Sequence, residues 1–151
     1  MEVAQLALKY GIKTVFAGPM QHGYPLPQFI DNKTTFYLGQ ISQTDKIAWN
    51  KRAKINTQFQ SWPTCATLSA KESLAYGSAI IALPVGGWPD FIKQGVNGFI
   101  INSEEDFVKA WAARDTIKQK DCWDTANDYS EDKMVEKLQA AFKSIVGEVL
   151  T

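Results

Sequence analysis

The sequence predicts an α/β fold in which helices flank a parallel β-sheet. Short apolar runs alternate with amphipathic stretches along the 151 residues, and this alternation is typical of strands and helices that follow one another in a parallel sheet. The run 79–85, "AIIALPV", is apolar throughout, as expected of a strand when both faces of its sheet are covered. Glycines close several of the predicted elements, which is a common way to end a helix or open a loop.

The amphipathic stretches predict helices with recognisable ends. Apolar residues recur at helical spacing from Val3, and Gly11 then provides a stop signal. Ser42 is placed to cap a second helix, and Ser103, with Asp106 three residues later, predicts a capping box. The predicted helical stretches are 3–10, 42–54, 69–77, a short helix within 86–95, 103–115 and 130–150.

The strands and loops between these helices follow from the apolar runs and the turn residues. The predicted strands are 13–18, 34–39, 55–61, 79–85 and 99–101. The stretch 19–33 is rich in Pro and Gly and predicts a loop, and Asn97-Gly98 predicts a turn. A polar link is expected before the last helix.

Composition and charge exclude several classes of function. A chain that is 45% hydrophobic predicts one packed domain over 1–151, and sixteen basic residues balance sixteen acidic ones without a basic block, which argues against a nucleic-acid partner. No apolar run is long enough to span a bilayer, and the start lacks a signal peptide, so we expect a soluble, cytoplasmic domain. Cys65 and Cys122 have no metal-ligand spacing and are expected to be free thiols.

The predicted sheet places a ligand site at the carboxyl ends of its strands, since ligand crevices of such sheets lie there. The loops that matter are those opening at Gly18, Gly39, Ser61 and Val85. The helix after the third of these loops carries Glu72 near its start. A helix N-terminus favours negative charge, so the position suits either a bound phosphate or a capping carboxylate of the helix itself.

A family resemblance rests on motifs that occur in order along this part of the chain. They are "FYLGQIS", the helix with Glu72 and Gly77, the strand after it, the Gly-Gly-x-Pro-acid turn at 86–90, and Gly-x-x-Gly-Phe at 95–99. Together they resemble the C-terminal, donor-binding domain of retaining glycosyltransferases with the two-domain GT-B architecture, of glycosyltransferase group 1 or family 4. The resemblance implies a Rossmann-like sheet and transfer of a sugar from a UDP-, GDP- or ADP-sugar to an acceptor that the sequence does not identify.

The resemblance also implies roles for individual residues. Glu72 matches the glutamate that accepts hydrogen bonds from the ribose of the donor, and the backbone around Ala66, Thr67 and Leu68 matches the diphosphate cradle. Neither a metal ion nor another cofactor is implied, because the helix N-terminus supplies positive potential. Ile41 falls where the main chain meets the nucleobase.

The remaining matched positions border the donor. Gly39 and Gly18 lie at loops beside the donor cleft, and Thr64 occupies a position that faces the donor sugar. No residue is assigned a catalytic role. His22, the only histidine, lies in a predicted loop and is interpreted as solvent-exposed rather than catalytic.

The sequence departs from the family pattern in ways that leave a second hypothesis open. Thr64 and Thr67 replace a glutamate and a glycine of the family. The first strand of the domain, between 13–18 and 55–60, is expected to be missing, together with the acceptor-binding N-terminal domain, so we expect a fragment or half of a two-domain protein, inactive alone and completed in cis or in trans. The alternative is a noncatalytic nucleotide-sugar-binding or interaction module. Ser69 and Glu72 also fit a capping box, in which Glu72 would only cap its helix.

Overall fold

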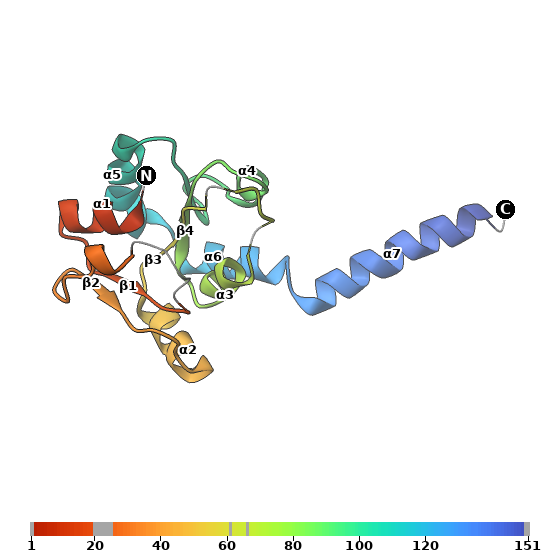
Figure 1. Cartoon of the computed structure of the whole chain (residues 1–151). Coiled ribbons are helices and arrows are strands. Elements are labelled where there is room, and N and C mark those ends of the chain that lie inside the picture. The colour runs from red at the N-terminus through yellow and green to blue at the C-terminus, as the bar shows by residue number, and fades with distance from the viewer. Residues whose placement is uncertain (1, 20–25, 61, 66, 150–151) are drawn as a thin grey trace.

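The computed structural model describes residues 2–19, 26–60, 62–65 and 67–149, and it has α/β architecture (Figure 1). The strands of this part of the chain are β1 (Thr14–Phe16), β2 (Thr35–Tyr37), β3 (Ile55–Gln58), β4 (Ala79–Ala82) and β5 (Gly98–Ile100). The α-helices are α1 (Val3–Tyr10), α2 (Gln43–Arg52), α3 (Leu68–Ala75), α4 (Trp88–Phe91), α5 (Glu104–Ala113), α6 (Gln119–Asn127) and α7 (Glu131–Val149). Two 3-10 turns, Leu26–Phe29 and Arg114–Thr116, complete the described elements.

The strand pairs of the described residues are all parallel, and these strands form two separate sheets. β1 pairs with β2, with Val15 opposite Phe36, and β3, β4 and β5 form the second sheet in that order. None of the described strands is hydrogen-bonded between β1 and β3. The sequence predicts this gap, because the resemblance leaves one strand position unfilled there.

The core lies on both faces of β4, and the side chains of this strand alternate between the two faces. Ile80 and Ala82 pack in one apolar cluster with α3, α4 and α6. Ile81 packs in the other with α1 and α5. All four residues of β4 are buried, which confirms the interpretation of its apolar run as a strand covered on both faces.

Helix ends follow the capping residues of the sequence in three places. Gly11 adopts a left-handed conformation with φ 62° and ends α1, and the Ser42 hydroxyl accepts a hydrogen bond from the Asp45 amide at the start of α2. Ser103 and Asp106 form the expected capping box of α5. These contacts satisfy backbone groups that the helix itself leaves unpaired.

Two sequence predictions need correction. The polar link before the last helix contains α6, which packs against α3 through the buried Cys122 although few of its residues are apolar. Gly98 belongs to β5 rather than to a turn, and a Cβ at this position would lie 2.2 Å from the Ile80 carbonyl oxygen. Glycine is therefore required by the close approach of two strands.

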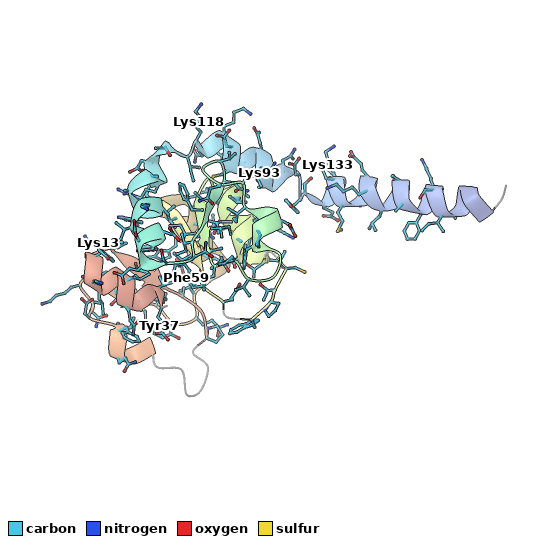
Figure 2. All side chains as sticks on the ribbon, turned by 90° about the horizontal axis from the view of Figure 1, so that it is seen from above. Lys13, Tyr37, Phe59, Lys93, Lys118 and Lys133 are labelled. Carbon is cyan, nitrogen blue, oxygen red and sulfur yellow. The ribbon has the colours of Figure 1, made fainter. Side chains whose placement is uncertain are left out.

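The last helix, α7, extends away from the rest of the molecule (Figure 1). Its side chains stand clear of the body in the view from above (Figure 2). The described helices include none that is both long and apolar enough to cross a membrane.

Candidate functional site

The candidate site is built around the start of α3, which follows the carboxyl end of β3. Thr67 is the N-cap residue, and its hydroxyl accepts a hydrogen bond from the Ala70 amide at 3.3 Å. The Lys71 amide donates to the Thr67 carbonyl. For the amides of Leu68 and Ser69 we find no partner within the described ranges, so this helix start presents free donors and the positive end of its dipole.

This cap decides between the two interpretations of Glu72 as a capping residue or a free carboxylate. The Ser69–Glu72 capping box is wrong, because the N-cap residue of α3 is Thr67, two residues before Ser69. Glu72 therefore lies in the second turn, too far along the helix to bond its N-cap amide. Its carboxylate is available for contacts outside α3.

Lys46 of α2 is the residue that contacts this carboxylate. Its Nζ lies 2.9 Å and 3.0 Å from the two oxygens of Glu72, and both side chains are about one-third exposed, at 37% and 35%. The same helix pair is joined by a hydrogen bond from the Ser73 hydroxyl to Asn50 at 3.0 Å. Since a carboxylate offers about four lone-pair sites, Glu72 retains acceptor capacity for a ligand.

A ladder of amide side chains supports the loop beneath the start of α3. Asn56, Gln58 and Gln60 are spaced two residues apart and so share one face of β3 and its extension. Gln58 is nearly buried, and its side chain contacts Asn56, Gln60, Thr67 and Ser69. The network fixes the Thr67 hydroxyl, and the site therefore rests on a hydrogen-bonded platform.

Thr64 and the turn after β4 are held together by a close backbone approach. The Gly87 amide donates to the Thr64 carbonyl oxygen at 2.8 Å, and the Thr64 hydroxyl donates to Gln60. Gly86 has φ 65°, and a Cβ there would lie 2.3 Å from the same carbonyl oxygen. The Gly86-Gly87 turn is confirmed, and its first glycine is required for the loop of Thr64 to lie where it does.

The structure brings Gly18 and Gly39 together, at the carboxyl ends of β1 and β2. The Gly18 amide donates to the Gly39 carbonyl oxygen at 2.9 Å, and the Tyr37 hydroxyl donates to the Gly18 carbonyl oxygen at 2.8 Å. Ile41 follows in the half-buried loop that leads into α2. This group is linked to α3 through α2, by the contact of Lys46 with Glu72.

The predicted site residues thus form two groups joined by α2. Thr64, Thr67, Leu68 and Glu72 lie on one loop and helix, with the Leu68 side chain 77% exposed. Ala66 and His22 lie outside the described residues. Within the described residues, no cluster of His, Cys, Asp and Glu is arranged to hold a metal ion.

Sequence reasoning missed Lys46 and the amide ladder. Amide side chains recur at positions 56, 58 and 60, and this period of two was the available signal for a polar strand face. The partner of Glu72 had no such signal, because 26 residues separate Lys46 from it and only the packing of α2 on α3 joins them.

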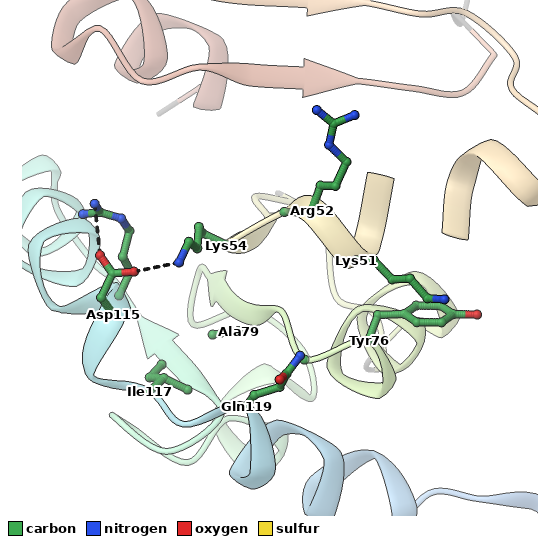
Figure 3. A pocket seen from close by; sticks show the side chains of 11 residues that line it. Lys51, Arg52, Lys54, Tyr76, Ala79, Asp115, Ile117 and Gln119 are labelled. Atoms are coloured by element: carbon green, nitrogen blue, oxygen red, sulfur yellow. Dashed lines mark ion pairs between the residues drawn. The ribbon is translucent and has the colours of Figure 1, made fainter. Parts of the chain in front are cut away.

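A pocket of about 290 Å³ lies at the opposite, amino end of β3 and β4 (Figure 3). Its cations have partners within the protein. Lys54 and Arg114 pair with Asp115 at 3.3 Å and 3.2 Å, and Lys51 lies over the ring of Tyr76. Since α2 and α3 end here, the cations also face the negative ends of two helices.

Comparison with solved structures assigns the fold. No protein-family model and no curated protein matches the sequence. The chain is similar to HepE of Anabaena, crystallised with UDP-glucose, with a TM-score of 0.69 and 15% identity over 93% of this chain and 44% of that one. It is also similar to AviGT4, a glycosyltransferase of avilamycin A biosynthesis, with a TM-score of 0.76 and 13% identity over 97% and 47% of the two chains.

A third structure covers one domain alone. The C-terminal domain of LpcC, a group 1 family glycosyltransferase from Francisella tularensis, matches with a TM-score of 0.52 and 17% identity over 83% of this chain and 91% of that one. The fold is therefore that of the Rossmann-like C-terminal half of GT-B glycosyltransferases. The chain spans less than half the length of HepE and AviGT4.

Proposed function

We propose that this chain is the donor-binding half of a retaining glycosyltransferase, which moves a sugar from a nucleoside diphosphate to an acceptor. The supporting observation is the likeness in fold, over 93% of the chain, to HepE, whose crystal structure contains UDP-glucose. HepE is about twice as long, so the proposal includes a second half, supplied in cis or in trans, that binds the acceptor.

In this proposal the start of α3 holds the diphosphate. The amides of Leu68 and its neighbours donate to phosphate oxygens, together with the backbone of Ala66 and Thr67, and the helix dipole stabilises the charge of the leaving diphosphate. The Thr67 hydroxyl narrows the approach of the diphosphate to the helix start, and Thr64 lies toward the donor sugar. No metal ion is needed for this binding mode.

Glu72 holds the ribose in this proposal, and Lys46 keeps its carboxylate in position. Ribose hydroxyls donate to the lone pairs that Lys46 leaves free. Ile41, Gly39 and Gly18 border the nucleobase. The protein then supplies binding and leaving-group stabilisation, while the acceptor and its activation belong to the second half.

The gap between β1 and β3 supports the part of the proposal in which another segment completes the protein. Among the described strands, β1 and β3 each have a partner on one side only, and an unpaired strand edge leaves amide and carbonyl groups unsatisfied, at a cost of about 1–3 kcal/mol for each buried group. We propose that a further strand, from the same or another chain, joins the two sheets and completes the donor domain.

The role of Glu72 is tested by Glu72→Gln, with Glu105→Gln as the matched control. Both substitutions remove one carboxylate from an ion pair: Glu72 pairs with Lys46 between α3 and α2, and Glu105 pairs with Lys109 within α5. We expect Glu72→Gln to weaken UDP binding about tenfold, from loss of one charged hydrogen bond, and both variants to keep nearly the wild-type melting temperature. Equal affinity of Glu72→Gln and wild type for UDP in calorimetric titration would show that Glu72 does not bind the ribose.

The second candidate is a noncatalytic nucleotide-sugar-binding module. Thr64 favours it, because a hydroxyl bonded to Gln60 replaces the carboxylate that the family directs at the sugar. A transfer assay with UDP-, GDP- and ADP-glucose separates the two. We expect no activity from the chain alone, and activity after addition of a matching acceptor-binding half favours the enzyme.

A further inference from the structure

Lys46 and Glu72 meet at the carboxyl end of the sheet, on two neighbouring helices. Lys46 is the fourth residue of α2 and Glu72 is the fifth residue of α3, so both lie within two turns of a helix start. The Ser73 hydroxyl donates to Asn50 at 3.0 Å and holds the two helices together. Since the loop of Ile41 leads into α2, the ion pair joins the segment proposed for the nucleobase to the helix proposed for the diphosphate.

The position of Lys46 leaves Glu72 only part of its acceptor capacity. The Lys46 Nζ lies 2.9 Å from one carboxylate oxygen and 3.0 Å from the other, so the ammonium lies in front of the carboxylate, between the two oxygens. It then occupies one lone pair of each oxygen, and the lone pairs left free point outward on opposite sides. The two neighbouring hydroxyls of a ribose therefore cannot both donate to Glu72 side by side.

Lys46 has a donor to spare. An ammonium carries three N–H groups, two of them face Glu72, and we find no other partner of the Nζ in the part of the chain that the structure describes. The neighbouring carboxylate, Asp45, accepts a hydrogen bond from the Ser42 hydroxyl at 2.7 Å at the start of its own helix. Because the Lys46 and Glu72 side chains are 37% and 35% exposed, a ligand can reach both of them.

We propose that Lys46 binds the ribose of the donor directly, together with Glu72. One ribose hydroxyl donates to a free lone pair of Glu72, and the neighbouring hydroxyl accepts the third N–H of Lys46, since a ribose hydroxyl is both donor and acceptor. The inference rests on the proposed function and narrows its ribose contact to an ion pair with two opposite roles. The pair selects a vicinal diol, because a deoxyribose leaves either the carboxylate or the ammonium without its partner.

The ion pair also suits an anionic donor. Glu72 lies about one turn along α3 from the proposed position of the diphosphate, and an uncompensated carboxylate at that distance would repel it. Lys46 cancels this charge. Glu72 can therefore accept a ribose hydroxyl without weakening the binding of the diphosphate beside it.

The test compares UDP with 2′-deoxy-UDP and 3′-deoxy-UDP, with dissociation constants taken from amide chemical-shift titrations. For wild type we expect each deoxy ligand to bind about tenfold more weakly than UDP, from loss of one hydrogen bond to a charged group. In Lys46→Met, one of these two penalties should fall below about twofold and the other should stay near about tenfold. Glu72→Ala should show the reverse pattern, because Lys46 still binds its own hydroxyl.

Lys109→Met is the control, since it breaks the ion pair with Glu105 within α5. It should change none of the three dissociation constants by more than about twofold. Loss of both penalties in Lys46→Met would show that Lys46 acts only by holding Glu72, and would overturn the direct contact. Both penalties kept in Lys46→Met, or both lost in Glu72→Ala, would assign the two hydroxyls to Glu72 and overturn it as well.

Failure of this inference is distinguishable from failure of the proposed function. A wild type that binds all three ligands equally, with shifts at 64–72, would place the ribose away from the ion pair and leave the diphosphate site standing. Absence of UDP-induced shifts at 64–72 would contradict the proposed donor site itself, and this inference with it.

Discussion

The two ends of the sheet formed by β3, β4 and β5 differ in how their polar groups are satisfied. At the amino end, Lys54 and Arg114 surround Asp115, and the helices α2 and α3 present their negative ends. At the carboxyl end, α3 presents its positive end, and the neighbouring side chains in the loop are neutral amides and hydroxyls.

This difference shows that a concentration of cations is a poor guide to an anion site. The amino-end pocket holds more positive side chains, but its cations are engaged by Asp115, by aromatic rings and by helix C-termini. The carboxyl end has fewer charges, and its donors at Leu68 and Ser69 have no partner in the described residues. The comparison therefore favours the carboxyl end for a diphosphate.

The largest loss of stability is expected from adding a side chain at Gly86, in the turn at the carboxyl end of the sheet. Gly86→Ala places a Cβ against the Thr64 carbonyl oxygen and also strains a backbone with φ 65°. We expect a loss of about 3 kcal/mol in the free energy of unfolding, measured in urea. Gly95→Ala is the control: its φ is 75° and its Cβ meets nothing within 4 Å, so only backbone strain of about 1 kcal/mol remains. Equal losses would show that the contact with Thr64 is unimportant.

The two cysteines differ in solvent exposure, because one lies in the loop at the carboxyl end of the sheet and the other on the buried side of α6. Cys65 is exposed, whereas burial raises the pKa of the Cys122 thiol to about 11, with a smaller contribution from Asp121. At neutral pH we expect Cys65 to react with a thiol reagent at least about a hundred times faster than Cys122. Cys65→Ser should abolish the fast phase, and in denaturant the remaining thiol should react freely. Rapid labelling of Cys122 in the folded protein would contradict its burial.

A smaller effect is expected from the ion pairs at the amino end. Asp115→Asn removes the shared partner of Lys54 and Arg114, but the Asp115 and Lys54 side chains are 56% and 72% exposed. We expect the free energy of unfolding to fall by about 0.5 kcal/mol at low salt and by less at high salt, since solvent and ions screen such pairs. A loss above about 2 kcal/mol would mean that this end is held by the ion pairs rather than by the core.

Local chemistry made much of this fold predictable from sequence. The apolar run of β4, the stop at Gly11 and the capping box of Ser103 each depend on neighbouring residues, and each is confirmed. α6 was missed because its few inward residues, such as Cys122, give a weak periodic signal.

The candidate site was less predictable, because its contacts join distant segments. Ser69 and Glu72 matched a capping motif, yet Thr67 caps the helix, since its hydroxyl is held by the platform around Gln58. The pairing of Lys46 with Glu72 depends on how α2 packs against α3, which no local pattern encodes. The roles of Glu72, Thr64 and Ile41 toward a nucleotide remain predictions.

Titration of the isotope-labelled chain with UDP, followed by amide chemical shifts, tests the central claim most directly, because it compares the two ends of the sheet in one experiment. We predict weak binding with the largest shifts in residues 64–72 and 86–87, and smaller ones at 39–41. Shifts concentrated at 51–54, 76–79 and 114–119 would place the anion at the amino-end pocket and contradict the account.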